Sequence, residues 1–151
     1  MRIKVISLWE PWATAMRRKL KKNETRSWPT SYRGWLGIQA AKKEYRPRDY
    51  EFEFNAMVQG AGIWPHHLTT TYGHLLCIAN LVGCERTEAV RDVVTVRERA
   101  WGNYDDKRFA WITSPNDLIE LAEPIAVKGR QGIFEIDLPD DLFPAIDMVL
   151  R

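Results

Sequence analysis

The most constraining feature of the sequence is an eight-residue segment, Leu75 to Val82, that is apolar at every position except Asn80. A continuous apolar run of this length is typical of a strand that is buried on both faces. Other strands are predicted at residues 3–6, 24–28, 35–41, 109–112, 119–127 and 133–136. The Glu123-Pro124 step interrupts the fifth of these and indicates a sheet edge or a bulge, because proline cannot donate a backbone hydrogen bond.

Helices are expected between these strands. Pro11 starts a short helix along which Trp12, Met16 and Leu20 recur at four-residue spacing, and Asn23 is an acceptable left-handed stop. Further helices are predicted at residues 46–59, at 87–101 in two pieces and at 140–150, with a loop at 60–71. Short strands with inserted helices, in no regular βαβ order, favour an α+β fold on a small β-barrel over a doubly wound sheet.

The chain is expected to form one domain over residues 1–151, because no repeat, low-complexity tract or flexible linker divides it. No stretch approaches the eighteen or so apolar residues of a membrane span, and the segment Met1 to Lys4 does not resemble a secretion signal. The two cysteines, Cys77 and Cys84, are too few for a disulfide scaffold. We therefore expect a reduced, cytoplasmic setting and no membrane partner.

The net charge of +2 conceals a strong asymmetry along the chain. Residues 1–50 carry thirteen Lys and Arg against four Asp and Glu, whereas residues 51–151 carry nine against sixteen. This balance of +9 against −7 indicates an anion-binding face built mostly from the N-terminal third. The seven tryptophans would suit stacking on unpaired bases beside such a face. Alternatively, the tryptophans belong to the core and the charges are simply solvated.

A cluster of three charged residues is the most informative local pattern. Lys21, Glu24 and Arg26 lie within six residues, where a predicted helix passes into an extended segment. Alternation along a strand places Glu24 and Arg26 on one side, and Lys21 in the preceding turn can reach the same pocket. A partly desolvated ammonium is a candidate base or phosphate ligand, Glu24 can accept from a base or ribose, and Arg26 can grip phosphate. The alternative is a surface ion-pair cluster.

Together with their neighbours, these residues resemble a known family. The resemblance rests on five segments, Ser7 to Ala13, Glu24 to Thr30, Tyr32 to Gly34, Ile38 to Lys42 and Pro124 to Phe134. In order and spacing they are similar to the ASCH domain, the activating-signal-cointegrator homology family, over nearly the whole chain. The resemblance implies a β-barrel of the PUA-like type that binds RNA or another nucleic acid in a cleft beside the barrel.

The family's signature, G-x-K-x-x-E-x-R, matches Lys21, Glu24 and Arg26, but Lys19 stands at the glycine position. One branch resembles a small amidohydrolase that removes the acyl group of N4-acetylcytidine with a lysine, a threonine nucleophile and a glutamate. Glu24 stands at the threonine position here, so that hydroxyl chemistry is not carried over. Other members have been proposed to be metal-assisted ribonucleases, for which Glu98 is a second candidate carboxylate. Its place in the capping-box pattern of residues 95–98 is the competing explanation, and both stay open.

Two classes of function follow. In the first, a basic cleft binds single-stranded RNA or a nucleotide; its candidate residues are Lys21, Glu24 and Arg26, rimmed by Trp28, Tyr32 and Arg33. In the second, a hydrolase acts on RNA or a modified nucleobase; its candidate acid and base residues are Lys21, Glu24 and Glu98. No cofactor or metal site is predicted from the three histidines His66, His67 and His74, and a divalent metal is expected only for a nuclease. A third alternative is a protein-interaction domain that uses exposed tryptophans and a large apolar patch.

Overall fold

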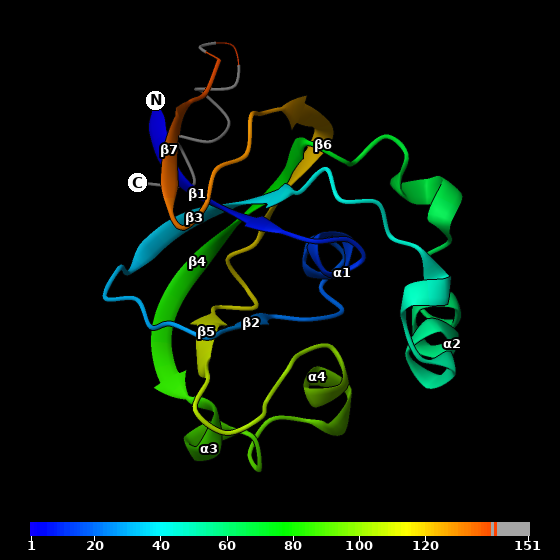
Figure 1. The fold of residues 1–151 in the computed structure, drawn as a ribbon. Helices are drawn as coiled ribbons and strands as arrows, with labels where there is room; N and C mark the ends of the chain where they lie inside the picture. Colours follow the sequence, from blue (N-terminus) through cyan, green and yellow to red (C-terminus); the bar gives the residue numbers. More distant parts are fainter. Residues whose placement is uncertain (140, 142–151) are drawn as a thin grey trace.

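The structure, a computed structural model, describes residues 1–139 and 141, so the helix predicted at 140–150 lies outside the described residues. It is a mixed α+β fold with helices around one sheet (Figure 1). The strands are β1 (Arg2–Leu8), β2 (Asn23–Arg26), β3 (Gly34–Ala40), β4 (His74–Arg86), β5 (Phe109–Thr113), β6 (Ile119–Ala126) and β7 (Phe134–Asp137). The helices are α1 (Trp12–Arg17), η1 (Pro47–Asp49), α2 (Phe52–Gly60), η2 (Pro65–Leu68), α3 (Thr87–Val90) and α4 (Val96–Ala100).

Strand β4 organises the sheet. The order is β2-β5-β4-β3-β1-β7, with β6 also paired to β4. Leu81 of β4 pairs with Gly34 of β3 and with Thr113 of β5, so these two strands lie on opposite edges of β4. All pairs are antiparallel except β1 with β3, which run parallel. The apolar run that predicts a buried strand therefore forms the centre of the sheet, because only a central strand is covered along both edges.

The predicted α+β class is confirmed, but the predicted small β-barrel is wrong, because the seven-stranded sheet of the described residues does not close. Strand β2 has four residues and pairs with β5, while β1 pairs with β3 and β7, so no β1–β2 ladder forms in residues 1–139. The two strands are bridged instead by a side chain: Nη2 of Arg26 donates to the carbonyl oxygen of Ser7 at 2.6 Å. This hydrogen bond crosses the seam between β1 and β2, along which the sheet is open.

The core lies on both faces of the sheet. One cluster packs α1 residues Ala13 and Met16 onto strand residues such as Ile6, Ile38 and Trp111. A second apolar cluster lies between β1, β4, β6 and β7, and a third lies around α2 and is built on Val58 and Trp101. Trp101 and Trp111 are almost completely buried, and Trp12, Trp28 and Trp35 are partly buried against the core, so the core alternative fits five of the seven tryptophans; Trp9 and Trp64 are exposed.

Several predicted elements are confirmed in kind but differ in extent. Two helical pieces form between 87 and 101, and the β4–β6 register shifts between Leu75 and Cys77, as the Glu123-Pro124 step predicts. The predicted helix over 46–59 is broken at Tyr50, which is extended, and the predicted loop over 60–71 contains η2. The first helix ends at Arg17 rather than Asn23, because Lys19 adopts a left-handed conformation with φ 60° and turns the chain. The basic run 18–22 is therefore a turn and not a helix face.

None of the helices in the described part of the chain is long and apolar enough to cross a membrane.

Candidate nucleic-acid interface

The three charged residues of the signature meet at the start of β2. The ammonium Nζ of Lys21 donates to Oε1 of Glu24 at 3.0 Å, and Nη2 of Arg26 lies 3.3 Å from the other carboxylate oxygen. The Lys21 side chain is 1% exposed, whereas those of Glu24 and Arg26 are 15% and 25% exposed. The structure thus brings the trio together as one ion-pair chain, with Lys21 buried behind Glu24 and Arg26 nearest to solvent.

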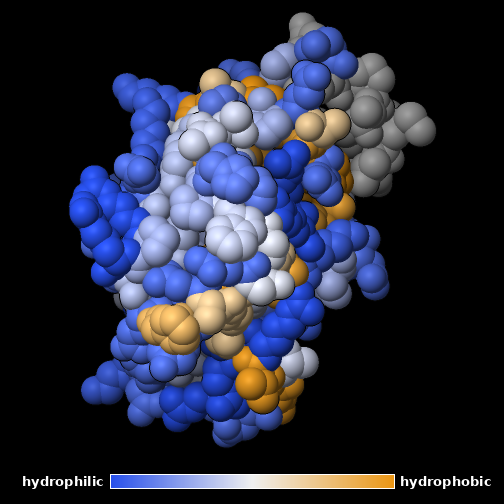
Figure 2. Space-filling model, turned by 90° about the vertical axis from the view of Figure 1, so that its right-hand side faces the viewer, coloured by the Kyte–Doolittle hydropathy of each residue, from blue (hydrophilic) through white to orange (hydrophobic). Residues whose placement is uncertain are grey.

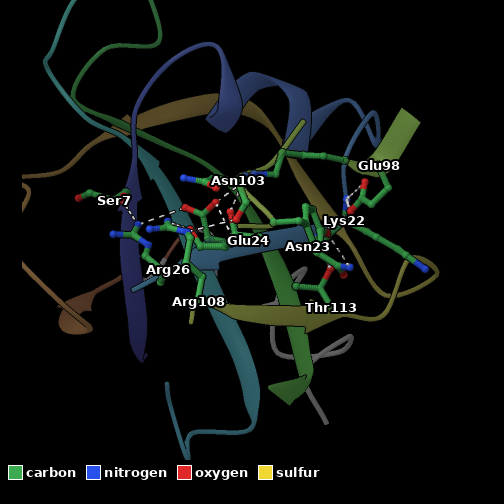
Figure 3. Close-up of polar contacts among 12 residues, drawn as sticks. Ser7, Lys22, Asn23, Glu24, Arg26, Glu98, Asn103, Arg108 and Thr113 are labelled. Atoms are coloured by element: carbon green, nitrogen blue, oxygen red, sulfur yellow. Dashed lines mark hydrogen bonds and ion pairs between the residues drawn. The ribbon is translucent and has the colours of Figure 1, made fainter. Parts of the chain in front are cut away.

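Helix α4 and the loop after it hold β2 in place (Figure 3). The Glu98 carboxylate accepts the backbone N–H groups of Lys22 at 2.9 Å and of Asn23 at 2.6 Å. The backbone N–H of Asn103 donates to the Thr25 hydroxyl at 3.0 Å, and Arg108 donates to the Thr25 carbonyl oxygen at 3.2 Å. These contacts fix the strand that carries Glu24 and Arg26 although β2 has only four residues.

Of the two hydrogen bonds in the predicted capping box of residues 95–98, only the one accepted by the Thr95 side chain forms. The Thr95 side chain accepts the N–H of Glu98 at 3.0 Å, so the threonine caps α4. The Glu98 carboxylate does not return to the helix, because it is engaged by the backbone of β2. In this geometry Glu98 is a positioning residue that faces backbone amides, and it does not line the cleft described next.

A cleft of about 590 Å³ lies along the open seam of the sheet. It runs between the end of β1, the start of α1, strand β2 and the loop after α4. Its wall is rich in aromatic residues, namely Trp9, Trp12, Trp28, Phe54 and Trp101. Its charged lining residues are Glu24, Arg26 and Arg108. An apolar wall with a few convergent polar groups is typical of a ligand site.

The two guanidinium groups line the cleft, and neither uses all of its N–H groups in hydrogen bonds within the described structure. Nε of Arg26 is buried and has no hydrogen-bond partner in the described structure. Arg108 donates only to the carbonyl oxygens of Asn103 and Thr25, and it forms no ion pair with a carboxylate among residues 1–139. With Glu24 as the one acidic lining residue, the cleft carries a net charge of +1.

The aromatic wall divides into exposed and fixed rings. Trp9 is 52% exposed, and Nζ of Lys43 lies 3.5 Å from its ring centroid in a cation–π contact. Trp12 stacks on Phe54 with ring centroids 5.2 Å apart, and Trp28 meets Trp111 edge-on at 4.7 Å. Trp9 is therefore the ring most available to a stacking ligand, while the others form a preorganised wall.

Tyr32 and Arg33 do not line this cleft. The Tyr32 hydroxyl donates to the carbonyl oxygen of Trp35, and its ring receives the ammonium of Lys4 at 5.6 Å. Arg33 is exposed and donates to the carbonyl oxygens of Thr30 and Tyr32. Of the predicted rim residues, the structure places Trp28 alone in the cleft wall.

Several residues of the cleft were not predicted from the sequence, among them Trp9, Trp12 and Arg108. Trp9 and Trp12 belong to the segment Ser7 to Ala13, which supports the family resemblance. Their place in that segment was a sequence signal for a position near Arg26. Arg108 lies more than eighty residues from the signature in an ordinary polar stretch, and no local pattern marks it.

Among the described residues, the remaining titratable groups form no metal-binding cluster, and Cys77 is not a reactive thiol. No three His, Cys, Asp or Glu side chains gather in a metal-binding arrangement anywhere in residues 1–139 and 141. The carboxylates of Glu24 and Glu98 do not share a cleft, so these residues do not fit a two-carboxylate metal centre. Burial raises the pKa of the Cys77 thiol far above its ordinary value, which disfavours the reactive thiolate.

Figure 2 shows that the face carrying α2 is mainly hydrophilic, and its apolar areas are small and separate. Exposed large apolar side chains are scattered over several elements, among them Phe52, Val82 and Val96. On the coloured part of this face there is no large continuous apolar patch of the kind that the protein-interaction alternative predicts.

A family model and several solved structures are similar to the chain. The family model described as "ASCH domain" matches residues 6–127. No curated protein matches the chain. The crystal structure of ASCH from Zymomonas mobilis is 13% identical, with a TM-score of 0.48, and the match covers 98% of this chain and 95% of that one. A single-residue variant of the same Zymomonas mobilis protein is also similar, with 13% identity, a TM-score of 0.46 and coverage of 98% and 96%.

Proposed function

Because the chain belongs to the ASCH domain family, which is PUA-like and RNA-associated, we propose that its cleft binds single-stranded RNA. The observation that carries the proposal is the pairing of Arg26 and Arg108 with a tryptophan-lined wall in one cleft of about 590 Å³. Unpaired bases stack on aromatic rings, and guanidinium groups contact phosphate, so the two kinds of group in this cleft match the two parts of a nucleotide.

Each part of the cleft has a distinct role in the proposal. Trp9 offers an exposed ring for base stacking, and Lys43 above it would stay close to the phosphate of a stacked nucleotide. Arg26, whose side chain is 25% exposed, and Arg108 supply donors to phosphate oxygens, because each guanidinium keeps terminal N–H groups that no hydrogen bond of the described structure uses. Glu24 and Asn103 offer acceptor groups for base or ribose hydrogens.

The charge of the cleft limits how strongly binding depends on salt. Two phosphate contacts predict a slope of log K against log salt of about −1.4 for a single strand, from about −0.7 per contact. A fourfold rise in salt would then weaken binding about sevenfold.

The test is fluorescence anisotropy of a labelled twelve-nucleotide RNA over a salt series. Arg108→Gln should reduce the slope by about 0.7, and Arg26→Gln together with Arg108→Gln should reduce it by about 1.4. Trp9→Ala should weaken binding by about 1–3 kcal/mol. Arg48→Gln, which removes an exposed charge outside the cleft, is the control. RNA affinity that is independent of salt, or unchanged in the double variant, would contradict the proposal.

One observation favours a hydrolase as the second candidate. Glu24 lines the cleft with the Arg26 guanidinium 3.3 Å away, so an acid–base group and a group that stabilises negative charge lie side by side. Its test is turnover of RNA and of N4-acetylcytidine by the wild type and by Glu24→Gln. Products that form at equal rates in both would exclude Glu24 as the acid or base.

A further inference from the structure

A second cavity, of about 300 Å³, lies next to the cleft and shares no lining residue with it. It is bounded by the end of α1, the turn that follows, the start of α4 and the segment after β5. Lys21 lines this cavity and Glu24 lines the cleft, so the two hollows meet at the Lys21–Glu24 ion pair.

The cavity is strongly cationic. Its basic lining residues are Lys19, Lys21, Lys22 and Arg97, and its one acidic residue is Glu98. Both oxygens of that carboxylate face the backbone N–H of Lys22, and one also accepts from Asn23, so Glu98 is not available to the basic side chains. Within residues 1–139, the side chains of Lys19, Lys22 and Arg97 form no ion pair. Three cations without an ion-pair partner thus surround one hollow that contains a single carboxylate, so the lining keeps a net positive charge.

The rest of the lining suits an organic phosphate. Met16, Leu20 and Leu118 provide apolar surface, and Ser114 provides a hydroxyl. Lys19 lies at the rim of the cavity with φ 60°, a left-handed backbone conformation that is energetically unfavourable for a residue with a Cβ atom. The chain therefore carries a lysine at a position where glycine would be less strained, and this lysine adds to the charge of the cavity.

We propose that this cavity is a second phosphate-binding site, which holds a backbone phosphate of the RNA strand whose base occupies the cleft. The phosphate of a free mononucleotide has the same chemistry and is the other source. The RNA strand is favoured because the cavity adjoins the cleft across a single ion pair. The assignment of the phosphate to an RNA strand rests on the proposed function, whereas the phosphate site itself does not.

The experiment compares three proteins, the wild type, Lys22→Gln with Arg97→Gln, and a control with Arg48→Gln and Arg130→Gln. The control removes the same charge from two exposed arginines that line neither hollow. Each protein is titrated with the labelled twelve-nucleotide RNA and, by calorimetry, with AMP. Tryptophan fluorescence reports the cleft separately, because four tryptophans line the cleft and none lines the cavity.

Loss of the one phosphate contact in the cavity should weaken RNA binding about fivefold at about 0.1 M salt and flatten the salt slope by about 0.7, in addition to what the cleft contributes. Quenching of tryptophan fluorescence at saturating RNA should be retained in the cavity variant. That result would show that the weaker binding does not come from damage to the cleft. If RNA binding is unchanged but AMP binding falls in the cavity variant, the site stands and free nucleotide is the source. If neither probe distinguishes the cavity variant from the control, the proposal is overturned. If the wild type binds no RNA, the proposed function fails and AMP alone decides the phosphate site.

Discussion

The ammonium of Lys21 lies 3.0 Å from Oε1 of Glu24, and the lysine side chain that carries it is 1% exposed. A buried cation of this kind is tolerated because a carboxylate is fixed beside it. The pair also separates the cleft from the cationic cavity, and it connects the turn after α1 to β2. We therefore expect both the cleft and the cavity to keep their shape only while this ion pair is intact.

The two halves of this pair should differ in their contribution to stability. Glu24→Ala leaves the Lys21 ammonium buried without a partner, and we expect the free energy of unfolding to fall by about 3–5 kcal/mol. Lys21→Met should cost less, about 1–3 kcal/mol, because Glu24 retains Arg26 and some exposure. Denaturant unfolding measures both. Lys22→Met, at the exposed neighbouring position, should change stability by less than about 0.5 kcal/mol. An equal cost at positions 21 and 22 would refute the burial argument.

Glu98 is expected to affect stability and RNA binding indirectly, by holding strand β2 in position. Glu98→Ala removes the acceptor of two backbone N–H groups, those of Lys22 and Asn23, and we expect a loss of about 2–4 kcal/mol in unfolding free energy. RNA affinity should fall with it, because Glu24 and Arg26 follow on the same strand. Glu98→Gln keeps one acceptor oxygen and should restore most of both quantities. Glu53→Ala, on the exposed face of α2, provides the control. Full stability of Glu98→Ala would argue against a positioning role.

Glu10 should make stability depend on pH. Burial raises the pKa of this carboxyl above its ordinary value, while hydrogen bonds from Thr14 and Thr71 act in the opposite direction. The folded state then binds the proton more readily than the unfolded state. The stability contributed by Glu10 is therefore complete below the unfolded pKa and is lost as pH rises through the folded pKa.

Glu10→Gln should remove that fall in stability between acidic and neutral pH, as measured by unfolding at a series of pH values. Its amide can donate to Thr71, whose hydroxyl also reaches the Leu68 carbonyl oxygen. Glu135→Gln is a control of opposite sign, because hydrogen bonding from Lys4 lowers the pKa of Glu135. Its contribution is lost as pH falls. A pH profile of Glu10→Gln that matches the wild type would rule out Glu10 as the source.

Lys19→Gly should stabilise the protein by about 0.5–1 kcal/mol, because φ 60° is unfavourable for a residue with a Cβ atom and open to glycine. Thermal or denaturant unfolding provides the measurement. The preceding residue is the matched control: Arg18 has an ordinary φ of −85°, so Arg18→Gly should destabilise. Destabilisation by both substitutions would show that the turn does not require the left-handed conformation.

The fold could be predicted from the sequence wherever the pattern is local. The apolar run 75–82 correctly predicts the central strand β4, and the two helical pieces between 87 and 101 follow from caps and periodicity. The closed barrel and the long first helix were wrong. Strands β1 and β2 are joined by the Arg26–Ser7 hydrogen bond and not by a ladder, and helix α1 ends at Arg17, just before the left-handed Lys19.

The candidate site shows the same division. The spacing of Lys21, Glu24 and Arg26 was sufficient to predict that three charges meet at the start of an extended segment, because neighbours in sequence must be neighbours in space. It was not sufficient to show that Lys21 is buried or that Tyr32 and Arg33 lie outside the cleft. Glu98 and Arg108 reach β2 from positions more than seventy residues away, through backbone hydrogen bonds that no spacing encodes.

By itself, therefore, the sequence determined the strand order along the chain, the family signature and the concentration of positive charge in the first fifty residues. The tertiary structure alone decided where that charge acts. Chain packing joined Arg26 to the distant Arg108 and to a tryptophan wall, and it engaged Glu98 with the backbone so that Lys19, Lys22 and Arg97 surround a second hollow. The physical reason is that burial and counter-charge depend on which surfaces meet in space, and non-local contacts determine that.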